Sequence, residues 1–253
     1  MLAEERRRRI ADHVRRHGRA EVSELSALFD VSRMTVRRDL AALAADGLLA
    51  RSWGGALVPE GSLSVEMPYA LKRRDNEEVK RRIGRRAAAL VRDGEVVILD
   101  GGTTTLHIAT HLRGKRGLTV VTNDLKIGGE IALLPEITLV VTGGILQEGT
   151  FSLLGPQTEE FFSGIRANRA FMGADAVDPA RGASTRTLLE VAVKRAMIAA
   201  ATEAILVADH TKFARQAFAQ FCRIDELAMV ITDHAVPADV LAPLGDLVRV
   251  EAA

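Results

Sequence analysis

Residues 95–106 read EVVILDGGTTTL, and this stretch decides the fold of the larger part of the chain. Its apolar run, Val96–Leu99, has the unbroken pattern of a strand buried on both faces of a parallel sheet. Asp100 ends the run, Gly101 and Gly102 permit a tight turn, and the threonines that follow begin a helix. Such a junction directs backbone N–H groups and a helix N-terminus at one point, where an anion can bind. The alternative is an ordinary turn with a threonine as the helix N-cap.

Apolar runs and helical stretches alternate on the C-terminal side of this junction. The runs after the first lie at 118–121, 137–141, 170–172, 204–208, 228–231 and 247–250. Helical periodicity is found at 77–91, 106–112, 125–134 and 187–201. Strands that alternate with helices are typical of an α/β domain, so the sequence predicts a largely parallel sheet with helices between its strands.

Polar residues follow most of the predicted strands. Asp100 follows the first run, Asn123 the second and Gly143 the third, and Asp209 and Lys212 follow the fifth. Each of these residues also suits a turn or a helix cap for local reasons. Because ligands bind beyond the carboxyl ends of parallel strands, the set together predicts a site for a phosphorylated sugar. In this site Lys212 neutralises the anion, and Asp100 and Asn123 bind hydroxyl groups.

Two charged segments have two interpretations each. Glu190 and Lys194 are one helical turn apart, so they either pair with each other or the lysine reaches the predicted binding site. The basic stretch 72–86 is either a second phosphate-contacting surface or a solvated helix face, and we favour the solvated face.

The first sixty residues differ from the rest, since they contain eleven arginines and no lysine. They have the pattern of three helices followed by a glycine turn, and the second and third helices form a helix-turn-helix. Ser32 is a suitable N-cap for the third helix. The outward face of that helix carries the residues predicted to contact DNA, together with Ser32: Arg33, Thr35, Arg37 and Arg38.

A solvated helix face is the alternative for these arginines, with Arg37 and Arg38 pairing with Asp39 at the surface. The segment RSWGGAL at 51–57 favours DNA, because a short strand, a glycine turn and a return strand make a wing. Arg51 of this wing is predicted to reach the DNA backbone or minor groove. Trp53 either packs against the wing or contacts sugar.

Composition sets further bounds on the 253-residue chain. The net charge is +1, so a basic surface has to be local, and the single cysteine excludes an internal disulfide framework. With no apolar run of membrane-spanning length and no secretory signal pattern, we expect a cytoplasmic, soluble protein. The histidine pairs His13/His17 and His107/His111 have helical spacing but no accompanying ligand motif, so no metal and no cofactor are predicted.

The sequence VSELSALFDVSRMTVRRDLAALAADGLLARSWGGA at 22–56 resembles the DeoR family of bacterial transcriptional regulators. The segments LDGGTTT, VVTND, VVTGG, AFMGAD, LEVAVKRAMI and VADHTKF resemble the sensor domain of that family, so the resemblance covers nearly the whole chain. It implies a winged helix-turn-helix at 1–58, a linker at 59–76 and an α/β sensor domain at 77–253, related in fold to ribose-5-phosphate isomerase. Four residues depart from the usual family pattern. Trp53 stands in place of histidine, Gly101 in place of serine or alanine, Asn168 in place of aspartate and Ala214 in place of glycine.

The resemblance also implies which residues bind the effector. The phosphate loop would be Asp100, Gly101, Gly102, Thr103, Thr104 and Thr105, and the rest of the site Asn123, Gly143, Lys194, Asp209 and Lys212. The leading hypothesis is therefore a repressor of a sugar or related carbon-metabolism operon. It would bind double-stranded operator DNA as a dimer or tetramer, under control of a phosphorylated metabolite. The alternatives are a sugar-phosphate isomerase and a winged helix used only for protein contacts.

Overall fold

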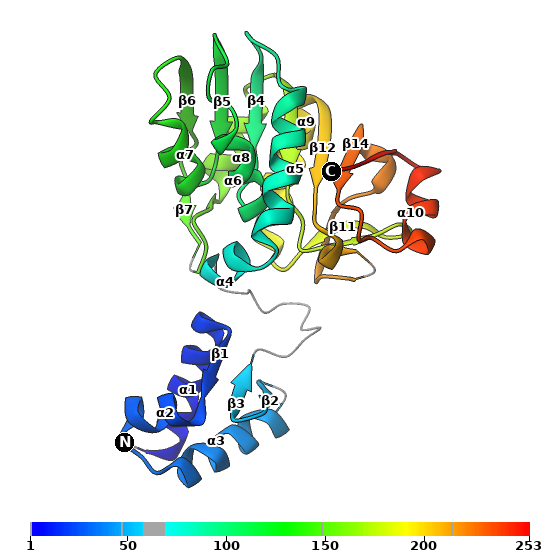
Figure 1. Ribbon diagram of the computed structural model, residues 1–253. Coiled ribbons are helices and arrows are strands. Elements are labelled where there is room, and N and C mark those ends of the chain that lie inside the picture. Colours follow the sequence, from blue (N-terminus) through cyan, green and yellow to red (C-terminus); the bar gives the residue numbers. More distant parts are fainter. Residues whose placement is uncertain (1, 47, 58–68, 148, 214) are drawn as a thin grey trace. The chain divides into compact units, whose positions relative to one another are not determined.

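The structure of the chain, a computed structural model, describes residues 2–46, 48–57, 69–147, 149–213 and 215–253. The chain divides into two units, Met1–Asp75 and Asn76–Ala253 (Figure 1). Of the predicted linker at 59–76, residues 59–68 lie outside the described residues, and Tyr69–Arg74 form helix α4. In the described parts of the chain, no helix is long and apolar enough to cross a membrane.

A seven-stranded parallel sheet organises the larger unit, in the order β15-β14-β12-β9-β4-β5-β6. The strands are β4 (Val96–Leu99), β5 (Leu118–Thr122), β6 (Ile137–Val141), β9 (Ala167–Met172), β12 (Ala201–Val207), β14 (Met229–Thr232) and β15 (Arg249–Ala252). Every predicted apolar run overlaps one of these strands. The predicted α/β fold with a largely parallel sheet is confirmed.

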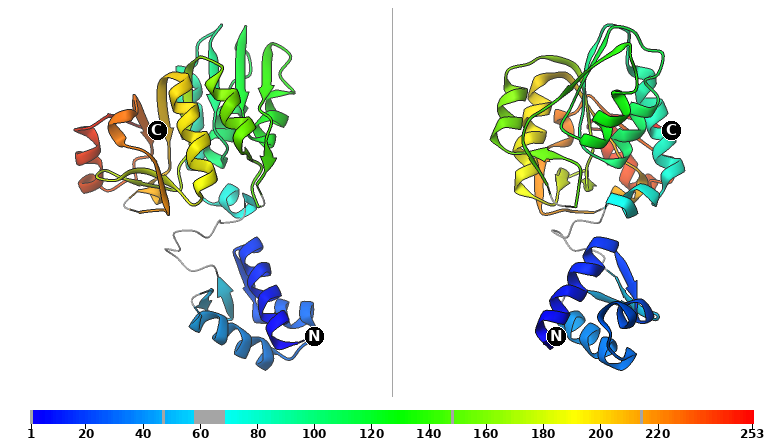
Figure 2. Two further views of the ribbon diagram at one scale, coloured as in Figure 1. Left: turned by 180° about the vertical axis from the view of Figure 1, so that it is seen from behind. Right: turned by 90° about the vertical axis from the view of Figure 1, so that its left-hand side faces the viewer.

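Helices cover both faces of this sheet (Figures 1 and 2). On one face, here called the α5 face, lie α5 (Glu77–Leu90), α6 (Thr103–Thr110) and α7 (Leu125–Ile131). On the other, the α9 face, lie α8 (Pro156–Ser163) and α9 (Leu188–Ala200). Successive strand residues alternate between the two cores: Val97 and Leu99 belong to the core of the α5 face and Ile98 to that of the α9 face. Burial on both faces explains why the runs are unbroken.

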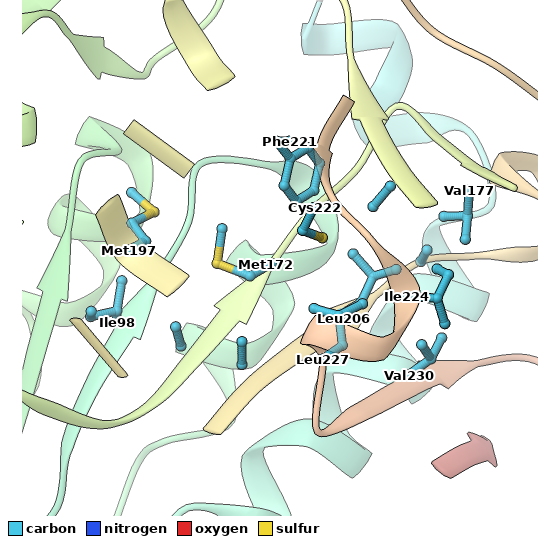
Figure 3. Packing of buried hydrophobic residues seen from close by; sticks show 14 of the residues in the cluster. Ile98, Met172, Val177, Met197, Leu206, Phe221, Cys222, Ile224, Leu227 and Val230 are labelled. Atoms are coloured by element: carbon cyan, nitrogen blue, oxygen red, sulfur yellow. The ribbon is translucent and has the colours of Figure 1, made fainter. Parts of the chain in front are cut away.

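Figure 3 shows part of the core on the α9 face, where Met172 and Leu206 of the sheet meet Met197 of α9 and Phe221 of a further strand, β13 (Ala219–Cys222). The only cysteine, Cys222, lies in this core. Burial, followed by the charge of Glu226, raises the pKa of its thiol to about 12. The thiol is therefore protonated at neutral pH and acts as a small apolar side chain.

Several short elements of the larger unit were not predicted. They are β7 (Ile145–Leu146), β8 (Leu153–Leu154), β10 (Ala176–Asp178), β11 (Gly182–Thr185), η1 (His210–Lys212), η2 (Ile224–Glu226) and α10 (Ala238–Gly245), besides α8 and β13. Strands β10, β11 and β13 form a small antiparallel sheet, and β7 pairs with β8. Runs of two to four residues carry too little periodicity to separate a strand from a loop.

The smaller unit contains the predicted helix-turn-helix and wing. Its elements are α1 (Ala3–His17), β1 (Arg19–Glu21), α2 (Val22–Phe29), α3 (Arg33–Ala45), β2 (Ala50–Ser52) and β3 (Gly55–Leu57). The wing strands β2 and β3 are antiparallel, and β1 adds to the outer edge of β3. Glycine is required at the start of β3, because a Cβ on Gly55 would lie 2.1 Å from the carbonyl oxygen of Ala20.

Candidate functional site

Helix α3 presents the residues predicted to contact DNA. Ser32 is its N-cap, as predicted, and its hydroxyl accepts a hydrogen bond from the Thr35 amide at 3.1 Å. The Arg33, Arg37 and Arg38 side chains are exposed, and Thr35 is half-buried. The opposite side of the helix packs into the core of the unit. A helix with one face packed into the core and three exposed arginines on the other has the geometry of a recognition helix.

The alternative of a surface ion pair between Asp39 and Arg37 or Arg38 is wrong, because Asp39 is not at the surface. Asp39 is fully buried, and its two carboxylate oxygens accept from Arg6 Nε at 2.7 Å and Arg7 Nε at 3.1 Å, both on α1. The carboxylate therefore ties α3 to α1 instead of neutralising Arg37 and Arg38. Within the part of the chain that the structure describes, Asp39 is paired with α1, so the positive charge of Arg37 and Arg38 remains available to another partner.

The wing has an exposed tip. Arg51 of β2 is exposed, and Trp53 in the turn is exposed over its whole side chain. Gly54 beside it has a φ of +86°, which favours glycine. Packing of Trp53 against the wing is therefore wrong, and the indole is free to make an intermolecular contact.

In the larger unit, the turn after β4 leads into helix α6, whose N-terminus has no side-chain cap from its N-cap residue. Helix α6 begins at Thr103, and its N-cap, Gly102 at a φ of +157°, has no side chain that could accept from the amides of the first turn. The alternative of a threonine N-cap is wrong, because the Thr105 hydroxyl donates instead to the Gly102 carbonyl at 3.0 Å. Thr103 and Thr104 are each 8% exposed. The first turn thus keeps the N–H groups that an anion would use.

Asn123 holds this turn in place. Its Oδ1 accepts from the Gly101 amide at 3.2 Å, and its Nδ2 donates to the Leu153 carbonyl at 3.0 Å. Gly101 is also confined, because a Cβ there would lie 2.2 Å from the Ser152 hydroxyl oxygen. Asn123 therefore positions the loop, which differs from the hydroxyl-binding role predicted from the sequence.

Asp100 pairs with Lys194 on the α9 face. Both side chains are buried, and Lys194 Nζ donates to Asp100 Oδ2 at 2.5 Å and to the Gly173 carbonyl at 3.1 Å. The Gly173 amide donates to the same Asp100 oxygen at 2.8 Å. Burial disfavours the charge of Lys194, but Asp100 and Glu190 outweigh it, so the pKa of Lys194 is raised. Asp100 is therefore engaged within the protein.

The ammonium group of Lys194 reaches the carboxyl ends of the strands, where it pairs with Asp100. Glu190 acts on it electrostatically and accepts from the Thr185 hydroxyl. Thr185 also donates to Asp175, which is paired with Arg186 at 3.5 Å. These contacts form one charged network on the α9 face. Of its members, only the proximity of Glu190 and Lys194 is predicted by the sequence.

Asp209 belongs to a second cluster, on the α5 face. It follows β12 and caps η1, with Oδ1 accepting from the Thr211 amide at 3.0 Å and, over a long 3.4 Å, from Nδ2 of Asn76. Burial raises the pKa of Asp209, but the Thr211 hydroxyl, Lys212 and Lys80 together lower it below its ordinary value. Lys80 is only 3% exposed.

Lys80 is not among the residues predicted to bind the effector, because the basic stretch 72–86 is expected to be a solvated helix face. That assignment holds for exposed residues such as Arg81 and Arg85. Lys80, however, lies on the buried stripe of α5 with Ile83, Gly84 and Ala87. Its spacing of three and four residues to Ile83 and Gly84 is the sequence signal that places Lys80 on the buried stripe.

The other predicted positions lie apart from these clusters. Gly143 is exposed beyond β6, and its carbonyl accepts from the Thr158 hydroxyl at 2.5 Å. Asn168 is at the amino end of β9, where its Oδ1 accepts from the Val96 amide at 2.8 Å. Asn168 therefore joins β9 to β4 at the amino ends of these strands, whereas the candidate site lies at the carboxyl ends.

Both histidine pairs make contacts within the protein. His13 Nε2 lies 3.0 Å from Glu24 Oε1, and His17 Nδ1 lies 2.8 Å from the His13 carbonyl. His111 Nδ1 lies 2.7 Å from the His107 carbonyl. Within the described residues, no three histidine, cysteine or acidic side chains come together as metal ligands would.

Each of the two units matches a model of a known protein family. A family model of the DeoR C-terminal sensor domain matches residues 75–234, and one of the DeoR-like helix-turn-helix domain matches residues 6–61. The HTH-type transcriptional regulator GlpR of Haloferax volcanii is 36% identical over 94% of this chain and 93% of its own length. The glycerol-3-phosphate regulon repressor of Escherichia coli strain K12 is 31% identical over 97% of each chain.

Among solved structures, ribose-5-phosphate isomerase A from Neisseria gonorrhoeae is similar to 55% of this chain and 54% of its own, with 20% identity and a TM-score of 0.41. The family models and the curated relatives span both units. The chain belongs to the DeoR family of transcriptional regulators.

Proposed function

We propose that this protein is a DNA-binding repressor whose affinity for its operator is set by a phosphorylated sugar or polyol. The single observation that carries the proposal is the uncapped first turn of α6 beside the buried polar clusters, in a chain with a free arginine face on α3. The name of the Escherichia coli relative, a glycerol-3-phosphate regulon repressor, supports an operon of sugar or related carbon metabolism. The protein acts in the cytoplasm, where the operator is.

The control is a linkage between two binding equilibria. An effector that binds one arrangement of the protein more tightly than the other shifts the population that is competent for DNA. Because one winged helix reads few base pairs, we propose that a dimer or tetramer binds repeated half-sites. Light scattering of the purified protein with and without operator DNA measures the assembly.

The isomerase alternative is not supported. The family and the full-length relatives are transcriptional regulators. Asp100, the carboxylate that the turn after β4 offers to a substrate, is held by Lys194 and the Gly173 amide. A general base has to be within reach of the proton that it removes.

DNA binding is expected to change the emission of Trp53. It is the only tryptophan of the chain and stands fully exposed at the wing tip, so contact with DNA should quench its fluorescence and shield it from iodide. The titration uses duplexes from upstream of the gene and its neighbours, at moderate salt. A duplex of equal length and scrambled sequence is the control. Equal binding to both duplexes would contradict a sequence-specific regulator.

Replacing Thr104 with aspartate is expected to abolish the effector response and leave DNA binding intact. A carboxylate in the first turn of α6 is favourable for the helix but occupies the place of the effector phosphate. We expect at least a ~100-fold loss of effector affinity, about 2.7 kcal/mol. Thermal shifts with a panel of sugar and polyol phosphates measure it.

The matched control is Thr110→Asp, at the last residue of the same helix. This variant is expected to respond to the panel like the wild type. If Thr104→Asp also responds normally, the turn after β4 does not bind the phosphate.

A further inference from the structure

The buried carboxylates at the carboxyl ends of the strands differ in what their oxygens contact. Asp124 Oδ1 caps α7 by accepting from Lys126 and Ile127. Both oxygens of Asp233 accept from His210, one from its amide and one at Nδ1. Asp100 is held by Lys194. Asp209 uses Oδ1 for its contacts, and among the residues that the structure describes its buried Oδ2 has no hydrogen-bond partner.

An acceptor of this kind needs an explanation. Leaving a buried polar atom unsatisfied costs about 1–3 kcal/mol, and more when the atom is charged. Asp209 is charged at neutral pH, since the Thr211 hydroxyl, Lys212 and Lys80 lower its pKa against the effect of burial. The unsatisfied oxygen is therefore a strong acceptor, and a bound donor would remove the cost.

Asp209 lies on the same face of the sheet as the uncapped turn of α6. Val207, two residues before it, belongs to the core of the α5 face, as does Ile108 of α6. The backbone of Asp209 is extended, so the alternation of the strand continues to it, and Asn76 at the N-cap of α5 contacts it there. By the same alternation, Asp100 follows Ile98 onto the α9 face.

The chemistry of the neighbours limits the donor. A fully ionised phosphate has no proton to donate to the carboxylate, and an ammonium group would be repelled by Lys80 and Lys212. A neutral hydroxyl group meets neither objection. It donates to the carboxylate in a charge-assisted hydrogen bond, which is stronger than a neutral one.

We propose that Oδ2 of Asp209 accepts a hydrogen bond from a hydroxyl group of the effector, whose phosphate binds at the first turn of α6, and that Lys80 and Lys212 line this subsite. The inference rests on the proposed function and adds to it the recognition of the polyol part. Asp209 then takes the hydroxyl-binding role that the sequence had suggested for Asp100.

The test compares two classes of phosphate ester on the full-length protein by calorimetric titration. Propyl phosphate offers the phosphate without hydroxyl groups, and glycerol 3-phosphate, ribose 5-phosphate and fructose 6-phosphate offer it with them. The wild type is expected to bind at least one polyol ester ~10-fold or more tightly than propyl phosphate, because a site with a buried acceptor disfavours a ligand that lacks the donor.

Asp209→Asn is expected to lose at least ~10-fold affinity for that polyol ester. Binding of propyl phosphate should stay unchanged or become tighter, because the substitution removes a negative charge near an anion. General damage to the site would weaken the binding of both esters, so a loss confined to the polyol ester identifies the hydroxyl contact. The matched control is Asp239→Asn, at an exposed position of α10, which should bind both esters like the wild type.

Three results would overturn the inference. If Asp209→Asn keeps the polyol preference of the wild type, a water molecule and not the effector donates to Oδ2, and the proposed function stands. If both esters weaken equally, Asp209 is structural. If no ester binds the wild type, the proposed function fails as well. If Asp209→Asn does not fold, the wild type is titrated with deoxy analogues of the preferred ester. The proposal requires that removal of one particular hydroxyl group lowers the affinity ~10-fold or more.

Discussion

Replacing Asp39 with alanine is expected to abolish DNA binding by unfolding the winged helix, although Asp39 does not face the DNA. Its carboxylate is fully buried between Arg6 and Arg7 of α1. Removing one side of a buried ion pair leaves uncompensated charge and typically costs about 3–5 kcal/mol. A domain of this size has a total stability of only about 3–8 kcal/mol, so most molecules would lose the fold of this unit.

Hydrogen exchange measured by mass spectrometry on the full chain distinguishes this result from a lost contact. In Asp39→Ala, peptides of α1 and α3 are expected to lose protection while those of the parallel sheet keep it. Arg38→Ala should weaken DNA binding and lower its salt dependence without changing exchange, because Arg38 is exposed. Asp46→Ala, at an exposed aspartate after α3, is the control for stability. Unchanged protection in Asp39→Ala would show that the buried pair contributes little.

The parallel sheet could be predicted from the sequence because each of its strands is buried on both faces. Such strands give unbroken apolar runs, and Val96–Leu99 was located to the residue. The strand β11 could not be found in this way. Its residues are alanine, glycine, serine and threonine, all buried, and it is specified by pairing with β10 and β13 instead of by its own pattern.

The candidate site shows the same limit for charged residues. Sequence reasoning placed Asp100, Asn123 and Asp209 at the strand ends correctly, because parallel strands bring their carboxyl ends together. Which of their side-chain oxygens the protein itself occupies cannot be predicted from the strand pattern. Lys194 approaches Asp100 from a helix 94 residues further along the chain, and the sequence carries no local signal for such a contact. Asp39 was misjudged for the same reason, since its partners are 33 and 32 residues away.

Replacing Lys194 with methionine is expected to destabilise the sensor unit by about 3–5 kcal/mol, the second large effect in this protein. Methionine fills much of the same volume, so the loss comes from Asp100, which keeps the Gly173 amide but loses the cation 2.5 Å away. Exchange of β4, β9 and α9 peptides in the full chain measures the loss, and protection of the winged helix should not change.

The double variant Lys194→Met, Asp100→Asn shows whether the loss arises from the pair. It removes both charges, so it should be more stable than Lys194→Met alone, and a coupling of at least ~1 kcal/mol is expected between residues in direct contact. Arg85→Met, which removes an exposed cation from α5, should change stability by less than about 0.5 kcal/mol. If Lys194→Met is as stable as this control, the Asp100–Lys194 pair is not what holds the α9 face to the strand ends. In that case Asp100 would be free to bind the effector directly, and the hydroxyl-binding role would return from Asp209 to Asp100.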